Sequence, residues 1–156
     1  MSEVKPRQGR AGIVLLSAAG VAVIERVRQG DRYHLLPGGG VKRGETLPDA
    51  ARREAFEELG IEISVGGLLG VVEFDNALQH YFVAHWTSGV FGSGTGKEMS
   101  SPADSSRGSY RASWLPTDRL VAEDLRPRPI ADALQAAPRI DQLVADWLAA
   151  PPHLVE

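Results

Sequence analysis

The sequence predicts an α/β (α+β) fold in which a mixed β-sheet packs against helices. Short apolar, β-branched segments bounded by turn residues come before one strongly marked helix, and more of them follow it. A second helical pattern lies near the C-terminus. The chain has 156 residues, which suits one domain with a real core, so we expect a single domain over residues 1–156.

Two predicted strands open the chain. Both are apolar and β-branched, and Ala18-Ala19-Gly20 separates them, which predicts a hairpin of residues 11–17 and 21–27. Residues 1–9 are expected to form a loose tail. A third short strand, Tyr33–Leu36, leads into a glycine-rich loop.

The best-defined element is a helix predicted over residues 47–59. Thr46 is a suitable N-cap, and Asp49 stands where the acid of a capping box would stand. Pro48 falls in the first turn, where its missing N–H costs nothing. Gly60 is a natural residue to end the helix.

This helix concentrates carboxylates on one side. Glu54, Glu57 and Glu58 stand at positions i, i+3 and i+4, so they share a sector roughly 100° wide at ~100° per residue. Three close carboxylates repel one another unless a cation relieves them, and oxygen ligands on a rigid element suit Mg²⁺. Taken alone, however, such a pattern is more often a solvated face. Arg53 precedes Glu57 by one turn and can pair with it.

The wider spacing resembles the box of the Nudix hydrolase family, Gly-x5-Glu-x7-Arg-Glu-U-x-Glu-Glu-x-Gly-U, with U a bulky aliphatic residue. Ala55 departs from this pattern, since it is smaller than the usual aliphatic residue, which affects packing and not the carboxylates. The resemblance implies a Nudix-like α/β/α sandwich. The matching residues are Gly39, Glu45, Arg53, Glu54, Glu57, Glu58, Gly60 and Ile61.

The resemblance also implies a division of roles. Mg²⁺, for which Mn²⁺ can substitute, would be held by Glu57 and Glu58, with Glu54 and the main chain of Gly39 nearby. Arg53 would orient Glu54 as the general base. Gly38 and Gly60 would shape the loop and the helix end, and Glu45 would either brace the loop or bind a second metal through water.

The general base has competing candidates. Many members of the family take a further acid from a loop shortly before a Trp, but residues 105–109, which precede Trp114, contain no acid. The nearest alternatives to Glu54 are therefore Glu98 and Asp104.

Substrate contacts are predicted from two places. Arg26 and Arg28 share one face of a strand, where they either bind phosphate or form a solvated face. Residues 88–109 are rich in Gly and Ser and form either a flexible loop or a lid that brings Lys97 and Glu98 to the substrate.

The implied activity is hydrolysis of a pyrophosphate linkage in a nucleoside diphosphate derivative. A (d)NTP or modified nucleotide is favoured. ADP-ribose, nucleotide sugars and dinucleoside polyphosphates remain alternatives, as does a sensor that binds a nucleotide without cleaving it.

Beyond the box, the pattern predicts three further extended segments and two helices. The first helix follows a stiff connector at residues 126–129, and the second carries an apolar stripe that either docks on the core or forms a homodimer face. The segments are residues 61–64, 68–74 and 78–87, and the helices are residues 130–136 and the stretch from Pro138 to Pro151-Pro152.

Composition narrows the remaining classes. The net charge of −3 argues against a nucleic-acid partner, and the absence of cysteine excludes disulfides, thiolate metal sites and Cys nucleophiles. Residues 1–10 are polar and the apolar run at 13–16 is short, so neither a signal peptide nor a membrane span is expected, and cytoplasmic residence is the default.

Overall fold

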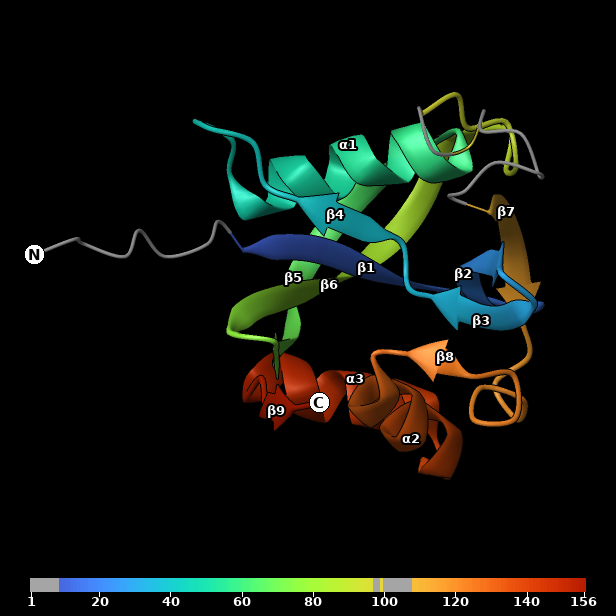
Figure 1. Cartoon of the computed structure of the whole chain (residues 1–156). Helices are drawn as coiled ribbons and strands as arrows, with labels where there is room; N and C mark the ends of the chain where they lie inside the picture. The colour runs from blue at the N-terminus through green and yellow to red at the C-terminus, as the bar shows by residue number, and fades with distance from the viewer. Residues whose placement is uncertain (1–8, 97–98, 100–107) are drawn as a thin grey trace, which may run out of the picture.

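A computed structural model describes residues 9–96, 99 and 108–156, and its elements form three layers (Figure 1). Helix α1 (Leu47–Leu59) covers one face of a curled mixed sheet. Helices α2 (Arg128–Ala136) and α3 (Ile140–Ala149) lie against the other side. The predicted α/β/α sandwich with a mixed sheet is confirmed.

The sheet has the strand order β8-β3-β2-β1-β6-β5-β9, with β4 paired to β1 and β7 paired to β2. The pairs β1–β6, β3–β8 and β5–β9 are parallel, and the others are antiparallel. The strands are β1 Arg10–Ser17, β2 Gly20–Arg28, β3 Asp31–Leu35, β4 Gly38–Gly40, β5 Ile61–Phe74, β6 Ala77–Gly89, β7 Ser109–Leu115, β8 Leu125–Arg126 and β9 His153–Val155.

The sheet separates two apolar clusters. In β1, Ile13 and Leu15 pack toward α1, whereas Val14 packs in the cluster that contains Ile130 and Leu134 of α2. Successive side chains of a strand point to opposite faces, so a strand covered on both sides must be apolar throughout. This explains the uninterrupted apolar runs of the first two strands. The small Ala55 is fully buried in the α1 cluster.

Helix α1 begins and ends as predicted. The Thr46 hydroxyl oxygen accepts a hydrogen bond from the Asp49 N–H at 3.2 Å, and proline lies in the first turn. Gly60 has the left-handed φ of 77° and its N–H donates to the Phe56 carbonyl at 3.0 Å. Both ends are therefore fixed locally by the residue types that the sequence provides.

Several predicted boundaries were wrong. Strand β5 runs unbroken through Gly66-Gly67, because its register against β6 shifts there and absorbs the glycines as an irregularity. The connector expected at residues 126–129 is divided between β8 and α2, since proline is tolerated in a first helical turn. The chain after Pro152 adds β9 to the sheet edge. In the described part of the chain, no helix is both long and apolar enough to cross a membrane.

Candidate active site

The glycine-rich loop and α1 meet at two carboxylates. The Gly38 N–H donates a 2.8 Å hydrogen bond to Oε1 of Glu58. A Cβ built on Gly39 would stand 2.3 Å from Oε1 of Glu54, so a larger residue there would force that carboxylate to move. Strand β4, which contains both glycines, is held by its pairing with β1. The loop backbone and the helix face are thus fixed against each other.

Arg53 connects the loop to the carboxylates through five hydrogen bonds. Its Nε and Nη2 grip both oxygens of Glu45 at 2.9 and 3.0 Å. Its Nη1 donates to Glu54 at 2.9 Å and to Glu57 at 3.3 Å, and Nη2 also reaches the Gly40 carbonyl at 2.9 Å. The predicted pairing of Arg53 with Glu57 is therefore present, within a larger network.

This network is strongly polarised. Hydrogen bonds from Arg53, with a further one from the Lys42 N–H, lower the pKa of Glu45 to about 2. Hydrogen bonds to Glu45 and Glu54 raise the pKa of Arg53. Glu54 and Glu58 are nearly buried, at 9% and 8% exposure. Glu45, Arg53 and Glu54 are thus tied together in one hydrogen-bonded network on α1 and the loop before it.

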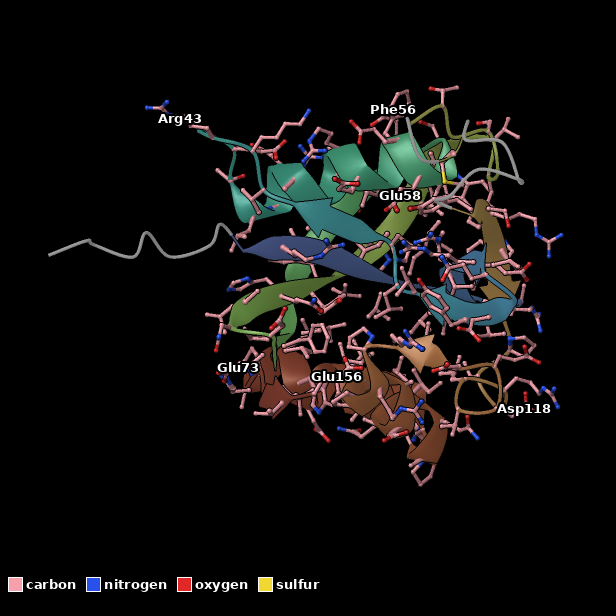
Figure 2. The ribbon with its side chains drawn as sticks, in the orientation of Figure 1. Arg43, Phe56, Glu58, Glu73, Asp118 and Glu156 are labelled. Carbon is pink, nitrogen blue, oxygen red and sulfur yellow. The ribbon has the colours of Figure 1, made fainter. Side chains whose placement is uncertain are left out.

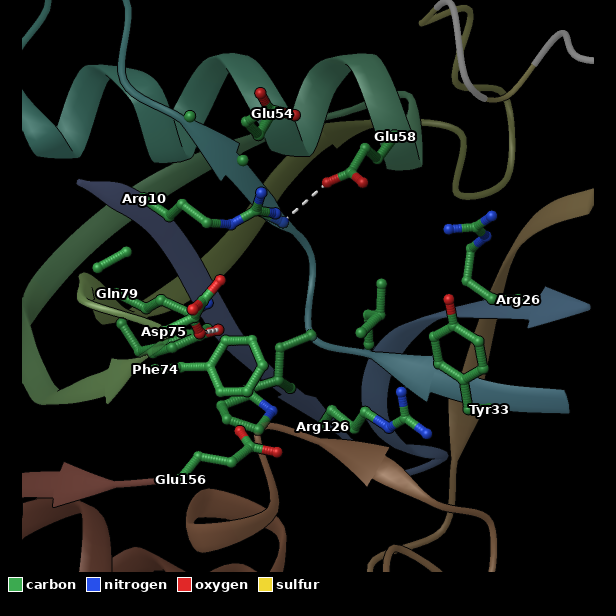
Figure 3. A pocket seen from close by; sticks show the side chains of 18 of the residues that line it. Arg10, Arg26, Tyr33, Glu54, Glu58, Phe74, Asp75, Gln79, Arg126 and Glu156 are labelled. Atoms are coloured by element: carbon green, nitrogen blue, oxygen red, sulfur yellow. Dashed lines mark hydrogen bonds between the residues drawn. The ribbon is translucent and has the colours of Figure 1, made fainter. Parts of the chain in front are cut away.

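A cleft of about 570 Å³ opens under α1 (Figure 3). Glu54 and Glu58 line it, whereas Glu57 does not. At ~100° per residue, Glu58 lies only about 40° from Glu54, and Glu57 lies about 60° away on the other side. Figure 2 shows Glu58 pointing from α1 toward the sheet, with Phe56 on the outer side of the helix.

The opposite walls of the cleft carry arginine and tyrosine side chains. The Arg26 guanidinium lies 3.7 Å from the ring centre of Tyr110 and 5.9 Å from that of Tyr33. The Arg126 guanidinium lies 4.2 Å from the Tyr33 ring centre. These four residues alternate cation and ring, and we call them the Arg–Tyr wall. Arg10 lines the cleft from β1, and the acidic residues Asp75 and Glu156 line it as well (Figure 3).

Strand pairing assembles the Arg–Tyr wall. Arg26 is opposite Tyr33 in the β2–β3 register and opposite Tyr110 in the β2–β7 register, and Leu35 is opposite Arg126. Sequence reasoning identified Arg26 but missed the other three, because they are distant along the chain and no local motif marks them. Arg28, the second predicted contact, is exposed at the end of β2 and does not line the cleft. Lys97, Glu98 and Asp104 lie outside the described residues.

The residues at the loop and on α1 offer the oxygen ligands that a hard cation needs. These are the carboxylates of Glu54, Glu57 and Glu58 and the bare main chain at Gly39, which are oxygen ligands of the kind that Mg²⁺ prefers. As the side chains lie, Arg53 bridges Glu54 and Glu57, and no three His, Cys, Asp or Glu groups among the described residues converge on one point. The carboxylate pair Glu54 and Glu58 shares one cleft with three arginines, Arg10, Arg26 and Arg126, and with the further acidic residues Asp75 and Glu156.

Comparison with known proteins shows which family the chain belongs to. The NUDIX domain family model matches residues 6–135, so the chain belongs to the NUDIX family, as the motif predicted. The MutT4 protein of Mycobacterium tuberculosis is 33% identical over 143 residues, which are 85% of this chain and 53% of MutT4. The chain covers between 36% and 53% of the length of the curated relatives that it matches.

Solved structures share the fold. A MutT NUDIX hydrolase from Burkholderia pseudomallei superposes with a TM-score of 0.62 and 26% identity, over 85% of this chain and 99% of that one. A NUDIX hydrolase from Nitrosomonas europaea gives a TM-score of 0.62 at 18% identity, over 99% of this chain and 81% of the other.

Proposed function

We propose that the protein hydrolyses a pyrophosphate linkage in a nucleoside diphosphate derivative and depends on Mg²⁺. The observation that carries this proposal is the cleft itself. Glu54 and Glu58 form one wall, and Arg10, Arg26 and Arg126 stand on the others. A polyphosphate is the ligand that joins such walls, because its oxygens can bind a cation on one side and guanidinium groups on the other.

Glu57 and Glu58 would hold Mg²⁺, for which Mn²⁺ can substitute, with Glu54 and the main chain of Gly39 nearby. When bound, the ion withdraws charge from the bridging phosphates and helps to activate a water molecule. Glu54 would act as the general base toward the attacking water. The Nη1 of Arg53 donates a 2.9 Å hydrogen bond to Oε1 of Glu54 and so holds this carboxylate in one orientation.

The Arg–Tyr wall favours a substrate that combines a planar group with several negative charges. The ring of Tyr33 lines the cleft, and an aromatic ring can stack on any of the nucleotide bases. Arg26 and Arg126 offer charge beside it. A (d)NTP or modified nucleotide meets both requirements and is the substrate class we propose, with a nucleoside monophosphate and pyrophosphate as products.

A release assay for phosphate, pyrophosphate and nucleoside monophosphate tests this proposal. The substrates are (d)NTPs, 8-oxo-dGTP, ADP-ribose, a nucleotide sugar and a dinucleoside polyphosphate, each with Mg²⁺ and with EDTA. We expect Mg²⁺-dependent cleavage that falls about 10²-fold or more in Glu57→Gln. Glu62→Gln removes an exposed carboxylate of β5 and should leave activity unchanged.

The substrate set also separates the alternatives. Preferred cleavage of ADP-ribose, a nucleotide sugar or a dinucleoside polyphosphate would overturn the (d)NTP assignment and keep the hydrolase. Nucleotide binding without any cleavage would refute the hydrolase proposal and favour a nucleotide sensor. The lack of an acid at residues 105–109 would then explain the missing activity.

A further inference from the structure

The glycine-rich segment after β6 lies along the last turn of α1. The Gly92 N–H donates to the Leu59 carbonyl and the Gly96 N–H donates to the Glu57 carbonyl, both at 2.9 Å. These carbonyls belong to the last four of the helix, which have no partner within it. The segment Phe91–Gly96, which we call the strap, therefore closes the helix end that carries Glu57 and Glu58.

The strap packs directly against the main chain of α1. A Cβ on Gly94 would stand 2.6 Å from the carbonyl oxygens of Glu57 and Glu58, and a Cβ on Gly96 would stand 2.9 Å from the Glu57 carbonyl and Cβ. Neither glycine has a left-handed φ. Glycine is therefore required at both positions by the lack of space and not by the backbone conformation.

An aromatic stack anchors the start of the strap. The Phe91 ring lies 4.5 Å from the Trp114 ring of β7, with 23° between the planes, and 6.1 Å from the Trp86 ring of β6. Phe91 and Trp114 both pack against the apolar cluster under α1. The Ser93 hydroxyl donates to the Val90 carbonyl at 2.6 Å and closes the turn that follows the anchor. The strap is thus tied to the sheet as well as to the helix.

We propose that the strap is a positioning element that sets the last turn of α1 and thereby the metal affinity of Glu57 and Glu58. Helix ends fray unless their carbonyls are satisfied, and these two carboxylates lie within the last three residues of α1. The loop at Gly38 binds only the carboxylate of Glu58, whereas the strap donates a hydrogen bond to the Glu57 carbonyl and packs Gly94 closely against the main chain of Glu58. This inference rests on the proposed function.

The experiment compares Gly94→Ala and Gly96→Ala with Gly70→Ala. The control is a strand glycine whose added Cβ would make only ordinary contact, at 3.4 Å from Pro152. Mn²⁺ binding is measured by electron paramagnetic resonance without substrate, and the Mg²⁺ dependence of turnover is measured separately. We expect the two strap variants to weaken Mn²⁺ binding about 10- to 100-fold, as changes around metal ligands do, with the control unchanged.

A second readout covers variants that fold poorly. Phe91→Leu removes the stack but keeps apolar volume, and hydrogen exchange should then speed up at the C-terminal turn of α1 while its first turn keeps its protection. Mn²⁺ affinity within twofold of wild type in folded Gly96→Ala and Phe91→Leu would overturn the proposal. Wild-type protein that neither binds Mn²⁺ nor cleaves any substrate would overturn the proposed function, and this inference with it.

Discussion

Substituting Arg53 by lysine tests the network that joins the loop to α1. The guanidinium makes five hydrogen bonds, and its side chain is 20% exposed. Lysine keeps the charge but cannot grip both oxygens of Glu45 while also reaching Glu54 and the Gly40 carbonyl. At about 1.5–3 kcal/mol for each charge-assisted bond, and allowing for partial exposure, the loss should be about 2–4 kcal/mol.

Thermal and urea unfolding measure this loss, and turnover is recorded on the same preparations. The unfolding midpoint should fall by about 4–16 °C for a chain of this size. Arg52→Lys is the matched control, since Arg52 makes one ion pair at 3.3 Å between side chains that are 49% and 56% exposed. It should change stability by less than about 0.5 kcal/mol. Equal stability of Arg53→Lys and Arg52→Lys would refute the reasoning.

Two further predictions concern the same site. Gly39→Ala places a Cβ 2.3 Å from Oε1 of Glu54 and should lower kcat about 10- to 10²-fold. The control Gly40→Ala has open space around the added Cβ and should change kcat little. Equal kcat values for the two variants would argue against the close contact at Gly39. Because the folded pKa of Glu45 is about 2, below its ordinary value of 4.5, its ion pair with Arg53 stabilises the protein above pH 4.5 and this contribution is lost as the pH falls toward 2. The difference in unfolding free energy between wild type and Glu45→Gln should shrink over that range, and a constant difference would contradict the assignment.

The local part of the site was predictable because its signals are short-range. The cap at Thr46, the end at Gly60 and the i, i+3, i+4 spacing of the glutamates are all read within one helix. The family motif added Gly39 and Glu45, whose spacing matches a loop that folds back on that helix. All of these residues lie in one continuous stretch of sequence, so they can be identified without knowing which strands pair.

The ends of regular elements were less predictable, because tertiary partners override local signals. Gly66-Gly67 reads as a break, yet the long pairing with β6 carries β5 through it. Residues 153–155 have no strand signal after two prolines, and they extend because the edge of β5 offers free backbone groups.

The sequence by itself determined the family, the helix and the carboxylates, since these follow from spacing along one continuous stretch. Only the tertiary structure decided what faces them. Tyr33, Tyr110 and Arg126 reach the cleft through strand registers, and the strap reaches α1 through hydrogen bonds between segments more than thirty residues apart. Contacts of this kind depend on how strands pair and how layers pack, which the spacing of residues within one element does not encode.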